Sequence, residues 1–391
     1  MDRRTLIAAG AGALFAQNSR PKGAVIGSGG RGQFLTGEFK EIGVEMAAVC
    51  DVYETNLQKG LQIANTGAKG YTDYRKLLDD KSIEVVVVAT PDHWHSRMVI
   101  DAVEAGKDVY VEKPLAHTIE EGFAIVEAQK RTGRIVQVGT QRRSFDLFLD
   151  AKRLYDSNVC GDVRLVSSYW YNHQTSLSPR QLEGKLDWQQ WLGTSPKRDL
   201  DAKRFFNWYY FWDYSGGLLI GQAAHIIDAV HWFLNAEAPI AVTCAGSKPN
   251  LEGAEVPETA SLTVEYADNT LVNFLIGYRA MRYAGVNDQL KQFHGSKARF
   301  DVGREGYALF PEAPKDIVMK PSVVVSKPGS FGSATRQHIR NFLEAVRTRQ
   351  QPSAPPTVAQ GTNIVLCMAM QSLREGRRLR WDAKSRKVFT S

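Results

Sequence analysis

The chain has 391 residues, of which 43% are hydrophobic and 23% charged, and its 49 Lys and Arg against 42 Asp and Glu give a net charge of +7. This length and composition fit a globular protein with two domains and a sizeable core. The basic residues form no stripe within a recognisable nucleic-acid-binding module, which argues against a nucleic-acid partner, and no run of about 20 apolar residues predicts a membrane span.

The first 19 residues have the pattern of an export signal. Arg3 and Arg4 precede an apolar, small-residue run from Leu6 to Ala16, and polar residues follow it. A basic start and a short apolar stretch are typical of bacterial export, and the paired arginines indicate the twin-arginine route. The alternative is a tail with two incidental arginines. We therefore expect a periplasmic or otherwise exported protein, and a cytoplasmic one if the alternative holds.

A short apolar strand over residues 22–26 leads into a G-x-G-x-x-G motif, and a helix is expected after it. In such a motif the first glycine makes a tight turn, the second lets a pyrophosphate approach the backbone, and the third packs the helix on the strand. The start of the helix then offers free N–H groups to phosphates. The motif residues expected to contact the cofactor are Gly27, Gly29, Gly30, Arg31 and Gly32.

The second strand, residues 45–50, ends in Asp51, which follows Gly32 by 19 residues. An acidic side chain at this distance accepts hydrogen bonds from the ribose of the adenosine and repels a 2′-phosphate. NAD is therefore expected rather than NADP, although Arg31 could neutralise a phosphate if it turned that way.

Further strands are expected over residues 84–89, 109–111 and 135–138, with helices over 96–105 and 119–131. The third strand is a continuous β-branched run, as in strands buried on both faces. Alternating strands and helices predict a doubly wound parallel sheet, that is, a Rossmann domain, which we place at residues 20–143.

Two strand ends carry a more specific pattern. The third strand runs into Thr90, Pro91 and, four residues later, His95, and the fourth into Glu112, Lys113 and Pro114. Because the carboxyl ends of parallel strands open into the crevice where ligands bind, these residues other than Pro114 are expected to contact the cofactor. Together with the glycine motif, this pattern resembles the glucose–fructose oxidoreductase/inositol dehydrogenase (Gfo/Idh/MocA) family from residue 22 to residue 381. The resemblance implies that Lys113 lies beside the nicotinamide and the substrate hydroxyl, that His95 lies near the nicotinamide ribose, and that Pro114 follows a cis bond.

Chemistry supports Lys113 independently. Oxidising a secondary alcohol removes a hydroxyl proton while hydride leaves the carbon, and a closed crevice beside a cationic nicotinamide disfavours the ammonium form of a lysine. The alternative is an ordinary strand-end lysine paired with Glu112. His93 and His95 have no third ligand at a recognisable spacing, so no metal site is expected.

The pattern changes after residue 144, where alternating strands and one long helix predict an α+β domain over residues 144–391. Its expected strands cover residues 163–174, 240–245, 260–266, 271–276, 289–293 and 298–302. The resemblance implies an open, largely antiparallel sheet with helices on one face, and subunit contacts on the other face that make a homo-oligomer.

The long helix, residues 218–234, carries the second chemical signal. Gly221, His225 and Asp228 share one face of it. The family has an aspartate where this chain has Gly221; its loss removes a substrate-binding carboxylate and is expected to enlarge the pocket. Asp228 could hold His225 in one tautomer. Asp213 and His173 are the candidates to replace the missing carboxylate.

Eight of the eleven residues from Arg204 to Tyr214 are aromatic. Aromatic rings stack on the apolar faces of sugars, but they also build cores and subunit interfaces, and the sequence does not decide between these roles.

Three functions follow. The first is an NAD-dependent oxidoreductase acting on a sugar or polyol, with Lys113 and His225 assisting proton transfer. The second is a redox-assisted glycosidase with a captive NAD, which the resemblance also includes and which export favours. The third is a non-catalytic dinucleotide- or sugar-binding protein, supported only by the lost aspartate.

Overall fold

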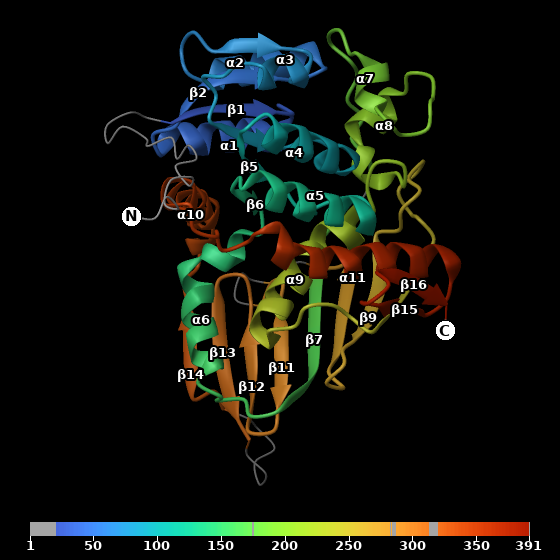
Figure 1. Ribbon diagram of the computed structural model, residues 1–391. Helices are drawn as coiled ribbons and strands as arrows, with labels where there is room; N and C mark the ends of the chain where they lie inside the picture. The colour runs from blue at the N-terminus through green and yellow to red at the C-terminus, as the bar shows by residue number, and fades with distance from the viewer. Residues whose placement is uncertain (1–20, 174–175, 282, 284–286, 313–319, 391) are drawn as a thin grey trace, which may run out of the picture.

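The computed structural model describes residues 21–173, 176–281, 283, 287–312 and 320–390. The predicted export signal lies outside these residues. Two sheets stand one above the other, and the long helix α11 (Pro356–Glu375) runs between them (Figure 1).

Six parallel strands form the first sheet in the order β3-β2-β1-β4-β5-β6. They are β1 (Lys22–Ile26), β2 (Glu45–Cys50), β3 (Lys69–Tyr71), β4 (Val85–Val88), β5 (Asp108–Val111) and β6 (Val136–Val138). The predicted Rossmann architecture is confirmed. The strand order reverses between β1 and β4, and in such sheets ligands bind beyond the carboxyl ends of the strands at this point.

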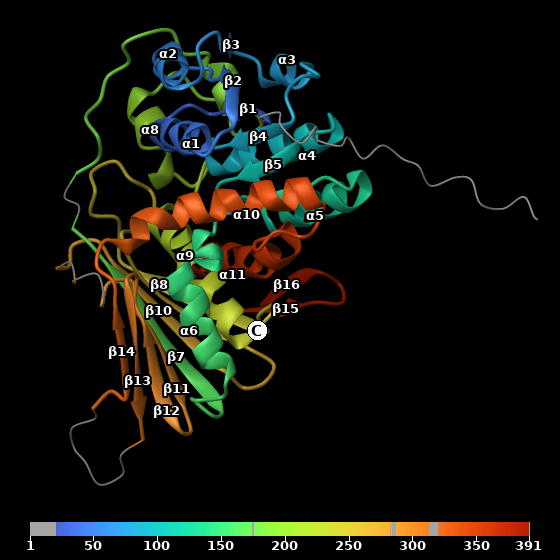
Figure 2. The same cartoon turned by 90° about the vertical axis from the view of Figure 1, so that its left-hand side faces the viewer.

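Helices cover both faces of this sheet. One face packs against α1 (Gly30–Glu41), α2 (Glu54–Ile63) and α10 (Ala334–Thr348), and the other against α3 (Tyr74–Leu78), α4 (His95–Glu104) and α5 (Ile119–Thr132). Helix α10 belongs to the part of the chain that we assigned to the second domain. Helix α10 nevertheless lies against the first domain (Figure 2). Its Ile339 and Phe342 complete the core of that domain.

Ten strands form the second sheet, in the order β14-β13-β12-β11-β7-β10-β9-β8-β15-β16. Only the central pair β7 and β10 is parallel among the described strand pairs, so the predicted largely antiparallel sheet is confirmed. The strands are β7 (Val163–Tyr171), β8 (Ala241–Gly246), β9 (Thr259–Glu265), β10 (Leu271–Gly277), β11 (Lys291–Gly295), β12 (Ala298–Val302), β13 (Gly306–Pro311), β14 (Val323–Ser326), β15 (Leu379–Asp382) and β16 (Lys387–Thr390).

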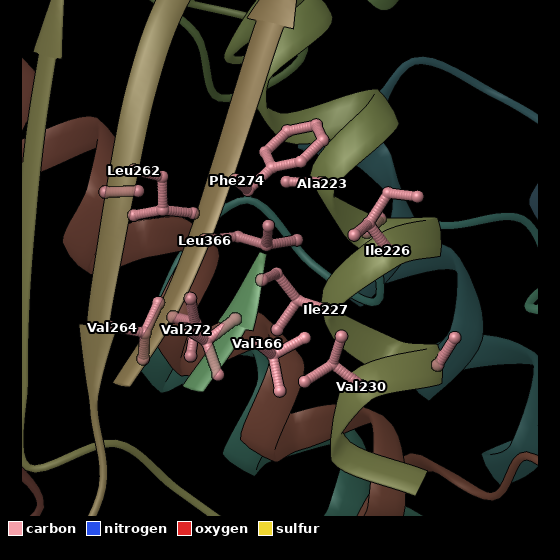
Figure 3. Packing of buried hydrophobic residues seen from close by; sticks show 14 of the residues in the cluster. Val166, Ala223, Ile226, Ile227, Val230, Leu262, Val264, Val272, Phe274 and Leu366 are labelled. Carbon is pink, nitrogen blue, oxygen red and sulfur yellow. The ribbon is translucent and has the colours of Figure 1, made fainter. Parts of the chain in front are cut away.

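One face of the second sheet is covered by α6 (Asp146–Asp156), α9 (Gly217–Leu234) and α11. Figure 3 shows the apolar side of α9, with Ile227 and Val230, pointing toward Val166 and Val272 of the strands. Helix α9 is long and apolar enough to cross a membrane by composition, but 78% of it is buried inside the chain, as expected of a core helix.

The segment between β7 and α9 reaches back over the first domain. It contains α7 (Trp188–Leu192), α8 (Ala202–Phe206) and the 3-10 turn η3 (Trp208–Tyr210). Its aromatic side chains pack around Tyr53, which follows β2, and Tyr53 and Leu186 form an isolated β-bridge. This segment therefore lies where it can cover a ligand of the first domain (Figures 1 and 2).

Candidate active site

The glycine motif forms an open cradle between β1 and α1. Gly27 has φ of +87°, and a Cβ there would lie 2.8 Å from the carbonyl of Ala89. A Cβ on Gly32 would lie 1.9 Å from the carbonyl oxygen of Gly27, so helix and strand pack closely. By contrast, Gly29 and Gly30 face open space. Backbone N–H groups are thus accessible at the start of α1, as a pyrophosphate requires.

Seven of the residues predicted to bind the cofactor line a single cleft above this cradle: Gly27, Gly29, Gly30, Arg31, Asp51, Thr90 and Pro91. The hydroxyl of Thr90 is closed to solvent and has no hydrogen-bond partner among the described residues. A buried polar atom without a partner is a place where a ligand is expected to bind. The remaining predicted cofactor residues, Gly32, His95, Glu112 and Lys113, do not line this cleft.

Asp51 is held rigidly at the end of β2. Its carboxylate accepts hydrogen bonds from the backbone N–H groups of Ser28 (2.7 Å) and Tyr53 (2.8 Å). Burial raises the pKa of Asp51 to about 6, and these hydrogen bonds oppose the rise. The group lines the cleft where a ribose hydroxyl would reach it.

Arg31 is bound to Glu112, with its Nη2 2.7 Å from Oε1. Arg31 is therefore already paired, and it is not free to neutralise a 2′-phosphate. Because Glu112 takes Arg31 as its partner, the alternative in which Lys113 pairs with Glu112 is wrong. The ion pair ties the glycine motif to the end of β5.

The aromatic segment closes the other side of the cleft. Trp191, Phe205, Phe206 and Trp208 line it opposite the glycine motif. Tyr53 anchors the segment, because its ring packs edge-on against Phe205 at 5.2 Å between centroids. These four rings therefore face the dinucleotide cleft, a role that the sequence did not suggest.

Lys113 is close enough to act electrostatically on both His225 and Asp92, a residue that the sequence did not identify. Asp92 is 3% exposed and accepts a hydrogen bond from the Ser215 hydroxyl (2.6 Å). Burial raises the pKa of Asp92, whereas the positive charges of His95 and Lys113 oppose the rise. The Lys113–Pro114 bond is cis, as the resemblance implied.

His95 braces two turns and has no free ring nitrogen. It is 1% exposed, its Nδ1 lies 2.7 Å from the carbonyl oxygen of Pro114, and its Nε2 lies 3.1 Å from that of Thr90. His95 therefore fixes the Thr-Pro turn against the Glu-Lys-Pro turn. Its place beside the nicotinamide ribose stays a prediction.

His225 is not held by Asp228. Both oxygens of Asp228 accept hydrogen bonds from Arg143 Nε (2.9 and 3.0 Å), while the Nδ1 of His225 is closed to solvent and lacks a partner. The His225 ring lies 6.0 Å from that of Trp170. Burial, and then the charges of Arg142 and Lys113, hold the pKa of His225 well below its usual range, so its ring is neutral near pH 7.

Arg142 is a second residue that the sequence did not single out. Its guanidinium is 1% exposed, and its Nε and Nη1 have no hydrogen-bond partner among the described residues. Its Nη2 donates to Gln289. Because no short motif surrounds it, only the fold reveals that this cation lies near His225.

The pocket is not enlarged at Gly221. A Cβ there would lie 1.5 Å from the hydroxyl oxygen of Tyr209, so the Tyr209 side chain already fills the space. Neither of the two residues expected to replace the missing carboxylate, Asp213 and His173, takes its place. Asp213 is paired with Arg198 (2.6 Å), and His173 is exposed, with its backbone bridged to Arg279.

No group of three His, Cys, Asp or Glu side chains within the described ranges is arranged to hold a metal ion. His93 is buried, and its Nε2 lies 3.2 Å from the carbonyl oxygen of Trp191. Burial lowers the pKa of His93 to about 3.

Comparisons with protein families cover both domains. Residues 22–140 match the model of an oxidoreductase family with an NAD-binding Rossmann fold, and residues 185–380 match the C-terminal alpha/beta domain of the same family. The cleft between the glycine motif and Asp51 is therefore an NAD site.

The chain is also similar to curated relatives and solved structures that are dehydrogenases. An inositol 2-dehydrogenase of Salmonella typhimurium is 36% identical over 134 residues, which are 34% of this chain and 40% of that protein, so the match spans two fifths of the relative's length. An inositol 2-dehydrogenase/D-chiro-inositol 3-dehydrogenase of Lactiplantibacillus plantarum is 25% identical over 320 residues, 80% of this chain and 78% of that one. A levoglucosan dehydrogenase solved with NADH and levoglucosan has a TM-score of 0.73 at 17% identity, covering 93% of this chain and 99% of that one, and it shares the fold.

Proposed function

This chain belongs to the Gfo/Idh/MocA family of NAD-binding oxidoreductases, and on that premise we propose that it transfers hydride between NAD and a hydroxyl- or carbonyl-bearing carbon of a sugar or polyol. The observation that carries the proposal is that Lys113, at the end of β5, is close enough to act electrostatically on both Asp92, after β4, and His225, on α9. The relatives' names, inositol and levoglucosan dehydrogenases, support the substrate class.

The bound NAD supplies the hydride acceptor, and the protein supplies orientation and proton transfer. In oxidation, Lys113 acts as the base that takes the proton of the substrate hydroxyl, and the nearby Asp92 carboxylate offsets the positive charge of the protonated lysine. In reduction the same group returns the proton to the carbonyl oxygen. His225 is neutral, and its unpaired Nδ1 can accept or donate one hydrogen bond to the substrate.

A second function, redox-assisted glycoside cleavage, is favoured by the aromatic side of the cleft. Four rings and the anchored segment that carries them limit the escape of a bound dinucleotide. A retained NAD suits a reaction in which oxidation of one sugar carbon acidifies the C–H of its neighbour. Loss of that proton expels the glycosidic substituent from the next carbon, water adds to the double bond, and the hydride is returned.

Export and assembly complete the proposal. We assign residues 1–19 to a twin-arginine signal, and mass analysis of the mature N-terminus would test this. The helix-free face of the second sheet carries exposed Leu165 and Leu275 and the stacked rings of Tyr169 and Tyr171, and we assign it to the contact in a homo-oligomer. Sedimentation equilibrium should then give a mass above 43.5 kDa, and a monomer would contradict it.

The first experiment identifies the nucleotide and the reaction together. The purified protein is dialysed and denatured, released nucleotide is identified by mass and absorbance, and the native protein is assayed with sugars, polyols and aryl glycosides. Turnover of added NAD with a polyol supports the dehydrogenase. Stoichiometric retained NAD with glycoside cleavage supports the second function, and nucleotide binding without any turnover would leave a binding protein.

A further inference from the structure

The hydroxyl of Tyr209 rests against the backbone of α9 at Gly221. A Cβ on Gly221 would lie 1.5 Å from the Tyr209 Oη and 2.4 Å from its Cζ, distances that no real side chain tolerates. Gly221 is helical, and no left-handed conformation is recorded for it, so glycine is needed here for space rather than for backbone freedom. Any side chain at position 221 would displace the phenol.

Tyr209 holds this position from a different segment. It belongs to η3, before the start of α9, and its ring packs edge-on against those of Trp208 (5.6 Å) and Tyr210 (5.7 Å). The ring is thus fixed on its far side. Within the described ranges the Tyr209 hydroxyl forms no hydrogen bond, and this oxygen is not among the buried polar atoms that lack both solvent and a partner. The hydroxyl is therefore free to bind a ligand.

The surroundings of this hydroxyl are those of the proposed reaction. Among the charged groups, Asp92 has the largest effect on the pKa of Tyr209. Asp92 in turn is close enough to Lys113 for the two charges to interact. On α9, His225 follows Gly221 by four residues, one helical turn away on the same face. Tyr209 therefore lies over the face of α9 that carries His225, and Lys113 is close enough to act electrostatically on both His225 and Asp92.

We propose that the Tyr209 hydroxyl, which occupies the space that a side chain at position 221 would otherwise fill, binds a substrate oxygen at or next to the reacting carbon. This inference rests on the proposed oxidoreductase function and names a further substrate-contacting residue for it. The space is filled by a neutral phenol, so the chain selects its substrate here with a hydrogen-bond donor rather than with a negative charge.

The chemistry of the phenol makes this selection independent of pH. Burial, and then the negative charge of Asp92, hold the pKa of Tyr209 well above its usual range. The hydroxyl stays protonated throughout the working range and donates to a carbonyl or hydroxyl oxygen of the substrate. A carboxylate in the same space would instead accept from a hydroxyl and would titrate in acid.

The test compares four variants on whichever sugar or polyol the wild-type protein oxidises with NAD. Tyr209→Phe keeps the ring and its packing and removes the donor, so kcat/KM should fall about 100-fold, as for loss of one transition-state donor. Tyr155→Phe is the matched control, because Tyr155 packs against Phe233 and Phe293 and no hydrogen bond is recorded for its hydroxyl among the described residues. It should change activity by less than about 2-fold.

An exchange variant separates a chemical role from a structural one. Tyr209→Ala with Gly221→Asp places a carboxylate in the space of the phenol, and kcat/KM should recover part of the loss of Tyr209→Ala and gain a new decline below about pH 5. Wild-type turnover together with full activity of Tyr209→Phe would overturn this inference alone. A wild-type protein that neither binds nor turns over any sugar or polyol would overturn the proposed function and this inference together.

Discussion

The hydroxyl of Ser215 donates a 2.6 Å hydrogen bond to the buried carboxylate of Asp92. This bond joins the turn after β4 in the nucleotide-binding domain to the residue just before the glycines that start α9. It fixes the two halves of the site, Lys113 on one domain and His225 on the other, at a set distance.

Removing this bond should weaken both the fold and catalysis. We expect Ser215→Ala to lower the free energy of unfolding by about 1.5–3 kcal/mol, the typical value for a buried hydrogen bond to a charged group. Urea unfolding measures the loss, with Ser157→Ala as the control, because the Ser157 hydroxyl is exposed on the end of α6. Equal effects of the two variants would contradict the bridging role.

The environment of Asp51 predicts a pH dependence of stability. Its pKa of about 6 in the folded chain lies above the ordinary 3.8, so the folded chain binds the proton more tightly than the unfolded chain. Stability from this group is therefore greatest below about pH 4 and is lost as the pH rises to about 6, by about 3 kcal/mol in all. Asp51→Asn should remove this part of the dependence in NAD-free protein unfolded by urea from pH 4 to pH 8. Identical slopes in the wild type and the variant would refute it.

The same residue should set the choice of dinucleotide. Because the Asp51 carboxylate lines the cleft and Arg31 is bound to Glu112, a 2′-phosphate meets a negative charge there. We expect Asp51→Asn to reduce the preference for NAD over NADP by about 10- to 100-fold, the worth of one charge-assisted hydrogen bond. Dissociation constants of both dinucleotides measure it, and an unchanged ratio would contradict the assignment.

The aromatic side of the cleft should slow the release of the cofactor. Phe206 lines the cleft and packs against Tyr53, with ring centroids 6.1 Å apart. We expect Phe206→Ala to raise the dissociation rate of NADH about 10-fold or more, because burial of a phenyl ring contributes about 1.5–3 kcal/mol of binding free energy. Stopped-flow fluorescence measures the rate. Phe310→Ala, on strand β13 of the second sheet, is the control and should leave it unchanged.

The ion pair of Arg143 and Asp228 should act on stability rather than on the tautomer of His225. Both side chains are nearly closed to solvent, so Asp228→Ala leaves a buried cation without a partner and should cost about 3–5 kcal/mol. Arg143→Met with Asp228→Leu should recover most of this. Glu344→Ala, which breaks an exposed pair with Arg347, should cost under about 1 kcal/mol. A large loss of activity without a loss of stability in Asp228→Ala would instead favour a direct role at His225.

The sequence predicted the elements whose local pattern is strong. The run Val85–Val88 and the glycine motif suffice for the Rossmann sheet, because burial on both faces and a phosphate turn leave clear patterns. Strand β3 was missed, since Lys69, Gly70 and Tyr71 form a short, largely exposed edge without such a pattern.

Within the site, the residue types could be predicted but not their partners. Asp228 lies on the same face of α9 as His225, yet its carboxylate accepts a hydrogen bond from Arg143, 85 positions earlier in the chain. The sequence predicted an enlarged pocket at Gly221, because spacing along the chain does not indicate that the Tyr209 side chain packs against this glycine. His95 fits the family pattern, but both of its ring nitrogens are hydrogen-bonded to backbone carbonyls of the two turns that it joins. Such contacts depend on tertiary packing, which spacing along the chain does not encode.

The most direct test of the account is Lys113→Ala, measured for turnover and for NAD affinity in the same preparation. Lys130→Ala, at an exposed position near the end of α5, is the matched control and should behave as the wild type. We predict that Lys113→Ala lowers kcat by about 10²- to 10⁴-fold, the usual contribution of a positioned acid–base group, while the dissociation constant for NAD changes by less than about 3-fold. Retained turnover in Lys113→Ala, or loss of turnover only in proportion to lost NAD binding, would contradict the assignment of proton transfer to Lys113.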